Sequence, residues 1–479
     1  MLTASSPFSF ILFGASGNLA KLKIYPSLYV LAMKKRFPED YVIMGYARSE
    51  MSLEAFREMV GESVKKDLEE VNEKKLADFL SHVHYHQGAY DSEDDFVKLE
   101  KELQTLEKGW GERVRLAYLS VPPSTFNGIF ECLRHSGIST HKEASFRCIV
   151  EKPVGDDLQS FEDVRNTLMK SFKEDEIYLL DHYLGKEAVR NVYYLRYANI
   201  VLENILKNAL IHHVEIVADE SAGIEGRAGY FESVGTLRDM FQSHLLEMCA
   251  LLTMSIGEGG TIPAMRLNAL EQLYLPPAPD LRDIILQGQY AKGTFRGKPA
   301  LGYQDEKDVA KDSRTNTFVA LKLMSRMANW QGVPFYLRSG KRVAKKETRI
   351  SVQFQMPQAV EGGGPNRLDI ILQGEAGMRL HLQTKLGGSV PMFRPLIMED
   401  PLVCVGDCLP EHAVLLLEAI HGKREWYLSF DEVRTAWRLI DPLQACLEKK
   451  DTPLHLYEAG AKGPEEMESW IARDGISWM

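Results

Sequence analysis

The chain has 479 residues, of which 45% are hydrophobic and 26% charged, and its formal net charge at pH 7 is −10. This length is too great for one ordinary hydrophobic core, so we expect two domains, and the composition is typical of a soluble globular protein. The negative net charge opposes nonspecific binding to nucleic acid and to anionic membranes, and no apolar run reaches membrane-spanning length, so we expect neither partner.

The first residues of the sequence show no targeting signal. Met1–Pro7 has no basic flank and no long apolar stretch, whereas a secretory signal peptide contains both. We therefore expect a cytoplasmic protein.

Short apolar runs alternate with amphipathic stretches from the N-terminus to His182. This alternation is typical of an α/β domain in which helices cover a parallel sheet, and we place that domain at residues 1–182. Apolar residues at helical spacing predict helices over Lys21–Lys35 and Leu158–Phe172. The expected strands are Phe8–Phe13, Tyr41–Tyr46, Arg115–Val121, Phe146–Val150 and Ile177–Leu180.

A small-residue turn follows the first expected strand and opens the first expected helix. Gly14, Gly17 and Ala20 let the backbone turn tightly, approach a pyrophosphate and pack the helix on the sheet. The free N–H groups of the helix N-terminus favour phosphate charge. The pattern alone is weak, but its position between a strand and a helix predicts a dinucleotide-binding turn.

The end of the second expected strand indicates which dinucleotide binds. Folds that prefer NAD have an acidic residue near this point, which binds the ribose hydroxyls of the adenosine. Here Arg48 occupies the position, and the first carboxylate is Glu50. Arg48 is either an exposed charge at a strand end or a ligand of a 2′-phosphate, and because arginine binds phosphate in a bidentate manner we favour NADP.

Two charged motifs follow later strands of this domain. Glu151-Lys152-Pro153 comes after Phe146–Val150, and Asp181–Lys186 comes after Ile177–Leu180. Ligands of open α/β sheets bind at the carboxyl ends of the strands. If a helix begins at His182, then His182 and Lys186 lie on one face of it. With the Tyr183 hydroxyl they suit a phosphate dianion, so we predict an anionic substrate.

The pattern changes after His182. Strand-like runs without intervening helices are typical of an antiparallel sheet with helices on one face, so we expect an α+β domain over residues 183–479. The expected strands are His213–Ala218, Thr317–Lys322, Arg349–Gln355, Arg367–Gln373 and Met378–Thr384.

The second domain has two candidate functional segments. His244 lies in a helical pattern whose apolar residues include Leu237 and Phe241; it is either a core histidine or a partly desolvated general base. Gly332–Lys346 holds five basic residues, which either line an anionic pocket or form a solvated loop.

The six cysteines are scattered through the chain, which indicates reduced and mostly buried thiols. Cys404 and Cys408 are the only close pair. With no second pair and no nearby histidines, we expect no metal site there.

Taken together, these motifs resemble the glucose-6-phosphate dehydrogenase family in order and spacing. The resemblance runs from about residue 8 to the C-terminus, where Tyr457–Gly460 and Gly463–Glu466 also fit. It implies an N-terminal Rossmann-type domain followed by a β+α domain with a large, mostly antiparallel sheet. The motifs that carry it are Gly14–Lys23, Gly45–Ser49, Glu151–Gly155, Asp181–Glu187, Arg227–Tyr230 and Val333–Arg342.

The resemblance implies the reaction and the roles of the site residues. His244 would take the proton of the C1 hydroxyl of glucose 6-phosphate, and Asp181 would orient its imidazole. The products would be 6-phosphoglucono-lactone and NADPH, with no metal required. His182, Tyr183 and Lys186, with Lys346, would hold the 6-phosphate; Lys23, Lys152, Glu220, Asp239, Lys341 and, on the substrate side, Gln373 would hold the sugar; and Gly14, Ala15, Ser16, Gly17, Asn18, Leu19, Arg48, Tyr90 and Lys152 would hold NADP.

The resemblance also implies a homodimer or homotetramer, and it implies a cis peptide bond at Lys152-Pro153. Two other functions compete with the one it favours. One is a related sugar dehydrogenase that acts on an unphosphorylated sugar or uses NAD; it would leave His182 and Lys186 without a phosphate to bind. The other is a regulatory protein that binds NADP without catalysis, which the presence of both His244 and Asp181 disfavours. The sequence does not decide between dimer and tetramer, or whether the second domain holds a further nucleotide site.

Overall fold

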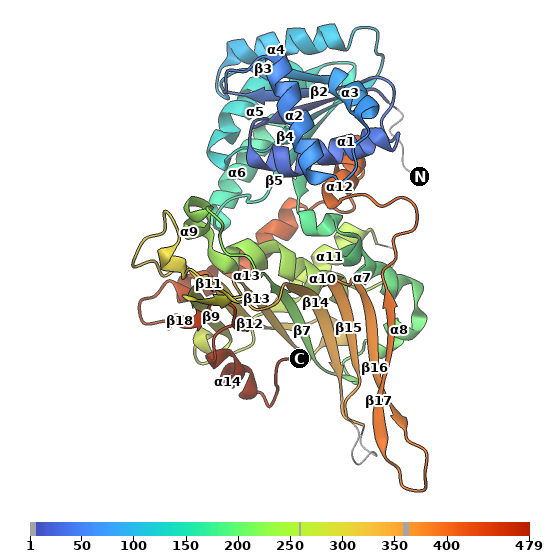
Figure 1. Cartoon of the computed structure of the whole chain (residues 1–479), viewed down its shortest axis with the longest axis vertical. Coiled ribbons are helices and arrows are strands. Elements are labelled where there is room, and N and C mark those ends of the chain that lie inside the picture. The colour runs from blue at the N-terminus through green and yellow to red at the C-terminus, as the bar shows by residue number, and fades with distance from the viewer. Residues whose placement is uncertain (1–5, 258–259, 358–363) are drawn as a thin grey trace. The chain divides into compact units, whose positions relative to one another are not determined.

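The computed structural model describes residues 6–257, 260–357 and 364–479. Residues 1–5, most of the Met1–Pro7 segment in which we expect no targeting signal, therefore lie outside the described residues. The chain divides into two compact units (Figure 1). The first comprises Met1–Lys186 and Val405–Phe430, and the second comprises Glu187–Cys404 and Asp431–Met479. Within the described ranges, no helix has the length and apolar character needed to cross a membrane.

A six-stranded parallel sheet forms the centre of the first unit. Its strands run in the order β3-β2-β1-β4-β5-β6, which is the order of a doubly wound dinucleotide-binding fold. Every residue of β1 is buried, because helices cover both faces of such a sheet. The strands are β1 (Phe8–Phe13), β2 (Tyr41–Ala47), β3 (Val83–Gln87), β4 (Arg113–Leu119), β5 (Ala144–Glu151) and β6 (Ile177–Leu180). The predicted Rossmann-type fold is confirmed, although β3 was not predicted.

The helices of the first unit begin at polar capping residues. Ser52, Asn72, Ser92 and Asp157 each accept a hydrogen bond from a backbone N–H of the helix that follows, which satisfies donors that have no partner inside the helix. The predicted helix Lys21–Lys35 starts instead as a short π-helix, η1 (Ala20–Ile24). The α-helices are α1 (Tyr25–Met33), α2 (Leu53–Asp67), α3 (Glu73–Ser81), α4 (Glu93–Leu106), α5 (Phe126–His135), α6 (Leu158–Ser171) and α12 (Glu411–Ile420), with 3₁₀ turns η2 (Pro123–Thr125), η3 (Ile138–Thr140), η4 (Glu174–Glu176) and η5 (His182–Gly185).

The second unit is built on a ten-stranded sheet. The order is β17-β16-β15-β14-β7-β13-β12-β9-β18, with β8 paired to β12. Most neighbours are antiparallel; β13 with β7 and β18 with β9 are the parallel pairs. The strands are β7 (Ile211–Asp219), β8 (Leu273–Tyr274), β9 (Ile285–Ala291), β12 (Phe318–Ser325), β13 (Pro334–Gly340), β14 (Glu347–Phe354), β15 (Arg367–Gln373), β16 (Gly377–Lys385), β17 (Phe393–Pro401) and β18 (His455–Glu458), and β10 (Gly293–Phe295) with β11 (Lys298–Ala300) form a separate hairpin. The large, mostly antiparallel sheet is confirmed.

Helices and an aromatic core complete the second unit. Phe318, Tyr336, Tyr457 and Trp470 are buried in one apolar cluster, which joins the C-terminal helix to the sheet. The helices are α7 (Glu187–Ala198), α8 (Ile200–Ile205), α9 (Ala228–Thr236), α10 (Leu246–Thr253), α11 (Ile262–Glu271), α13 (Phe430–Leu447) and α14 (Glu466–Ala472), with the π-helix η6 (Leu237–Leu245) and 3₁₀ turns η7 (Leu281–Asp283), η8 (Tyr303–Asp305) and η9 (Ala328–Trp330).

Residues 405–430 return to the first unit, although we had assigned them to the second domain. The Leu428 N–H donates to the Leu179 carbonyl at 3.0 Å, which extends the β6 edge of the parallel sheet. In the exposed segment before α12, Cys404 and Cys408 form a disulfide, so the expectation of reduced thiols is wrong for this pair. It holds for the four buried, free cysteines: Cys132, Cys148, Cys249 and Cys446.

A buried ionic network fixes the middle of the parallel sheet. The Arg115 guanidinium donates to Glu100 Oε2 at 2.6 Å and to Glu107 Oε2 at 2.7 Å. Arg113 Nε and Ser9 Oγ also donate to the Glu107 carboxylate, at 2.8 and 2.7 Å. Burial raises the pKa of Glu107, but the hydrogen bonds and charge of Arg115, with Ser9 and Arg113, outweigh it and hold that pKa below its usual value. The network ties β1 and β4 to the end of α4.

We predict that Glu107→Gln destabilises the first unit, because it leaves buried guanidinium groups without their anion. The free energy of unfolding at pH 7, measured by urea denaturation, should fall by about 3 kcal/mol or more. Since the folded-state pKa of Glu107 is lowered, its contribution is present above its unfolded-state pKa and is lost as the pH falls through the folded-state pKa. The variant should therefore lose less stability on acidification than the wild type.

Glu73→Gln is the matched control. Glu73 pairs with Lys65 at 2.8 Å, but its side chain is 72% exposed, and pairs of this kind contribute less than about 1 kcal/mol. Equal destabilisation by the two substitutions would contradict the structural role assigned to the buried network.

Candidate functional site

The turn after β1 is shaped for a close approach to phosphate. Gly14 has a φ of +81°, and a Cβ there would lie 2.1 Å from the Ser120 carbonyl oxygen. The N–H groups of Gly14 and Ala15 donate to the Tyr46 carbonyl at 3.0 and 3.3 Å, so the turn is anchored on β2. The next residues enter η1, where the first N–H groups of a helix have no intrahelical acceptor. Such a glycine turn at a helix start fits the pyrophosphate of a dinucleotide.

Arg48 lies beside this turn, at the end of β2. Its guanidinium carbon is 5.5 Å from the centre of the Tyr90 ring, and the hydroxyls of Ser16 and Ser49 are 3.2 Å apart. Burial raises the pKa of Tyr90, and the positive charge of Arg48 partly offsets that effect. In the described parts of the chain, no carboxylate pairs with Arg48. Its exposed cationic group fits a 2′-phosphate better than ribose hydroxyls.

The motif after β6 forms a 3₁₀ turn and not the α-helix that we considered. Asp181 is fully buried, and its Oδ1 accepts a hydrogen bond from the Tyr183 N–H at 2.8 Å, which caps η5. Lys186 follows the turn in an extended conformation, and its Nζ lies 3.5 Å from the centre of the Tyr183 ring. Tyr183 and Lys186 therefore meet through a cation–π contact. The expected cis peptide bond at Lys152-Pro153 is confirmed.

Helix α12 adds two side chains beside these motifs that the sequence reasoning missed. Glu411 Oε1 lies 3.9 Å from Lys23 Nζ. The ring of His412 is nearly parallel to that of His182, with centroids 6.2 Å apart, and its Nε2 lies 3.7 Å from Glu151 Oε1. A Cβ on Gly185 would lie 2.6 Å from the Glu411 carbonyl oxygen, so the glycine permits this approach. No local pattern could have revealed a contact between segments so far apart in the sequence.

Three predicted sugar ligands meet in the second unit. Glu220 follows β7 and Lys341 follows β13, and the parallel pairing of these strands brings the two residues to one end of the sheet. Lys341 Nζ pairs with Glu220 and lies 3.8 Å from Asp239 Oδ2. Tyr230, at the end of the quoted Arg-Ala-Gly-Tyr motif, donates to Asp239 Oδ1 at 3.3 Å. The Lys341 side chain is only 4% exposed, so a buried ammonium holds two carboxylates in place.

Asp239 and His244 lie on the same π-helix, η6 (Leu237–Leu245). Residues five apart point about 140° away from each other on an α-helix. In a π-helix the hydrogen bonds join residues i and i+5, so such residues lie in adjacent turns on nearly the same face. His244 is buried, as are Leu237 and Phe241, and the predicted apolar environment of His244 is confirmed. The π geometry, which the sequence pattern did not reveal, places Asp239 and His244 on adjacent turns of η6.

Lys346 and Gln373 lie in a different part of the second unit. Both line a cavity of about 450 Å³ with Arg349 and Arg367, and Gln373 Oε1 accepts a hydrogen bond from the Thr348 hydroxyl at 3.0 Å. Neither Glu220 nor Asp239 nor Lys341 lines that cavity. The predicted substrate contacts of Lys346 and Gln373 therefore stay predictions.

Comparisons with known proteins cover nearly the whole chain. Residues 11–191 match the family model "Glucose-6-phosphate dehydrogenase, NAD binding domain", and residues 193–479 match "Glucose-6-phosphate dehydrogenase, C-terminal domain". The chain is 35% identical to the glucose-6-phosphate 1-dehydrogenase of Chlamydia pneumoniae, covering 98% of this chain and 96% of the relative. It is 34% identical to that of Bacillus subtilis, covering 98% and 97%. A solved structure of a glucose-6-phosphate dehydrogenase in complex with glucose 6-phosphate matches with a TM-score of 0.91 and 31% identity over 100% of both chains.

Proposed function

This chain belongs to the glucose-6-phosphate dehydrogenase family, and we propose that it oxidises C1 of glucose 6-phosphate to 6-phosphoglucono-1,5-lactone with NADP as hydride acceptor. This is the first step of the oxidative pentose phosphate pathway. The observation that carries the proposal is the cluster in which the buried Lys341 ammonium lies between the carboxylates of Glu220 and Asp239. Both halves of the chain also match the family models.

We propose that this cluster binds the sugar hydroxyls. A carboxylate accepts hydrogen bonds from hydroxyl groups, an ammonium donates to them, and charge-assisted bonds of both kinds are stronger than neutral ones. Lys23 and Lys152 would complete the contacts to the sugar, with Gln373 on the substrate side. His182, Tyr183 and Lys186 would bind the 6-phosphate, with Lys346 assisting.

We propose that His244 is the general base. The imidazole would take the proton of the C1 hydroxyl as the hydride leaves C1, and Asp181 would orient the ring and stabilise the imidazolium. Burial of His244 supports this role, because it excludes water that would otherwise compete with the C1 hydroxyl for the imidazole nitrogen. The lactone then forms without a metal-bound intermediate in this scheme.

The nucleotide-binding residues of the first unit would be Gly14, Ala15, Ser16, Gly17, Asn18 and Leu19, with Arg48, Tyr90 and Lys152. NADP, when bound, supplies the hydride acceptor. The crowded backbone at Gly14 and the unpaired guanidinium of Arg48 both support the assignment. In this scheme residues 1–182 belong to the NADP-binding domain, and residues 183–479, apart from the returning segment 405–430, belong to the domain for substrate binding and oligomerisation.

We also propose that the chain forms a homodimer or homotetramer through the β16–β17 side of its large sheet. Strand β17 is an edge strand whose residues are almost all exposed, and Ile397 and Met398 are 53% and 55% exposed. An exposed apolar edge of this length needs a covering partner. A cytoplasmic location is likewise a proposal: the four buried free thiols fit it, whereas the Cys404–Cys408 disulfide does not.

NADPH formation by the purified protein tests the proposed reaction directly. Glucose 6-phosphate with NADP should give strong turnover, whereas free glucose, or NAD in place of NADP, should give little. Comparable rates with free glucose would overturn the phosphate assignment of His182, Tyr183 and Lys186. Binding of NADP without turnover of any substrate would favour a regulatory protein.

We predict that His244→Asn lowers kcat by at least ~10²-fold, the scale of a lost general base. The affinity for glucose 6-phosphate, measured by equilibrium binding without NADP, should change little, because Asn keeps a polar group of similar size. His135→Asn, an exposed position on α5, is the control for the loss of a histidine. Near-normal turnover of His244→Asn would show that His244 is not the general base.

We predict that Arg48→Ala weakens the binding of NADP far more than that of NAD, because only NADP carries the 2′-phosphate. The measurement is the Kd of each nucleotide, with Arg134→Ala, an exposed position on α5, as control. Equal weakening for both nucleotides would show that Arg48 does not contact the 2′-phosphate.

We predict that Met398→Glu reduces the assembled mass of the protein in sedimentation velocity, because it places a charge in the apolar β17 surface. Leu456→Glu is the matched control, since Leu456 is a 65% exposed apolar residue on β18 at the opposite edge of the sheet. An unchanged mass for Met398→Glu would place the association surface elsewhere.

A further inference from the structure

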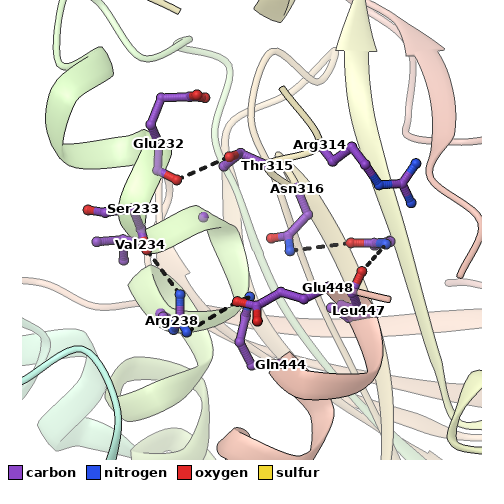
Figure 2. A pocket seen from close by; sticks show the side chains of 12 residues that line it. Glu232, Ser233, Val234, Arg238, Arg314, Thr315, Asn316, Gln444, Leu447 and Glu448 are labelled. Carbon is purple, nitrogen blue, oxygen red and sulfur yellow. Dashed lines mark hydrogen bonds and ion pairs between the residues drawn. The ribbon is translucent and has the colours of Figure 1, made fainter. Parts of the chain in front are cut away.

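A polar cavity of about 210 Å³ lies in the second unit (Figure 2). It is enclosed by the end of α9 and the start of η6, by the segment before β12, and by the C-terminal end of α13. None of the residues proposed above to bind sugar, phosphate or NADP lines it. Its function is therefore a separate question.

The floor of this cavity is already fixed by hydrogen bonds. Asn316 Oδ1 accepts from the Leu237 N–H at 3.2 Å, and its backbone carbonyl accepts from the Thr236 N–H at 3.0 Å. Gln287 Nε2 donates to the Leu447 carbonyl at 3.0 Å. These contacts attach the start of η6 to the segment before β12, and β9 (Ile285–Ala291) to the end of α13. A ligand would therefore meet a preformed surface and lose little affinity to reordering.

The charged residues that line the cavity are two arginines, Arg238 and Arg314, and two glutamates, Glu232 and Glu448. Arg238 and Arg314 lie on opposite sides of it (Figure 2). The Glu232 carboxylate is turned to Ser313 and Tyr303, where it accepts two hydrogen bonds. Glu448 lies 3.3 Å from Arg238, but its side chain is 59% exposed, and such a pair contributes little and opens readily. Arg314 donates one hydrogen bond to the Thr452 carbonyl at 2.7 Å, and Arg238 donates one to the Ser233 carbonyl at 3.0 Å. Among the described residues, no carboxylate pairs with Arg314, so its other donors remain for a ligand.

Two buried hydrogen-bonding atoms of the cavity residues have no partner among the described residues. Arg238 Nε is a donor, and Gln444 Oε1 is an acceptor; the amide nitrogen of Gln444 donates to Glu448 at 2.8 Å. A buried polar atom without a partner costs stability, so it is uncommon unless a ligand or water completes it. The cavity thus offers a cationic group at each side and an acceptor for a hydroxyl.

We propose that this cavity binds a small hydroxylated dianion, with one anionic group at Arg238, the other at Arg314, and a hydroxyl donating to Gln444 Oε1. Hydroxy-dicarboxylates and phosphorylated hydroxy acids share this chemistry, and the volume suits a molecule of that size. Because Arg238 directly precedes Asp239, the bound dianion holds the turn that carries a sugar ligand. It therefore tightens the binding of glucose 6-phosphate, an effect that rests on the proposed function.

Titration calorimetry on the full chain tests this site. Saturating glucose 6-phosphate fills the phosphate pocket of the proposed active site, so the probes cannot bind there, and the absence of NADP prevents turnover. The probes are malate, 3-phosphoglycerate and succinate, which lacks the hydroxyl. We expect malate or 3-phosphoglycerate to bind. Tighter binding of malate would indicate a hydroxy-dicarboxylate as the ligand, and tighter binding of 3-phosphoglycerate would indicate a phosphorylated hydroxy acid. Arg314→Gln should weaken that binding at least about tenfold, the effect of losing a charge-assisted bidentate contact. Gln444→Leu should weaken the binding of malate but not that of succinate, because only malate has a hydroxyl to donate to Gln444 Oε1.

Arg296→Gln, an exposed arginine on the β10–β11 turn, is the control and should bind the probes as the wild type does. Absence of binding, equal binding by Arg314→Gln, or binding that disappears when glucose 6-phosphate is added would each overturn the site. In a steady-state assay the bound probe should lower the KM for glucose 6-phosphate, and Arg314→Gln should abolish that shift while keeping the basal kcat. Binding without any change in KM would overturn the coupling to Asp239 and leave the binding site standing.

Discussion

The hydrogen bonds at the start of η6 set the geometry on which the rest of the candidate site depends. Asn316 holds the N–H groups of Thr236 and Leu237, and Gly235, with a φ of +61°, turns the chain from α9 into the π-helix. From that fixed start, the π hydrogen bonds join residues five apart, so Asp239 and His244 lie on adjacent turns of nearly the same face. On an α-helix begun at the same point, residues five apart would be rotated about 140° from each other.

The second constraint is electrostatic. Lys341 is buried, and an isolated buried ammonium is too costly to persist, so the two carboxylates of Glu220 and Asp239 are needed for the fold as well as for the proposed chemistry. The parallel pairing of β7 with β13 supplies the ammonium and one carboxylate from adjacent strand ends, and η6 supplies the other. A polyol that enters such a cluster exchanges its hydration for charge-assisted hydrogen bonds that are already oriented.

The parts of this structure that the sequence predicted are those set by local pattern. Strand β1 was placed at its observed bounds because its residues are uniformly apolar, as expected for a strand buried on both faces. Strand β3, with the sequence Val-His-Tyr-His-Gln, lacks that pattern because it lies at an edge of the sheet. The π-helices η1 and η6 were missed because apolar spacing does not distinguish a π turn from an α turn. The return of α12 to the first unit was missed because it depends on contacts between distant segments.

Residues 238 and 239 are adjacent on η6, but they belong to two different sites, the polar cavity and the Lys341 cluster. Arg238 lines the polar cavity and Asp239 pairs with Lys341, so adjacent residues of η6 face different surroundings. The start of this helix is held by Asn316, and the backbone joins the two residues directly. In the proposed coupling, a ligand that favours one position of Arg238 also favours one position of Asp239, and by linkage the sugar proposed to bind at Asp239 favours that ligand to the same extent.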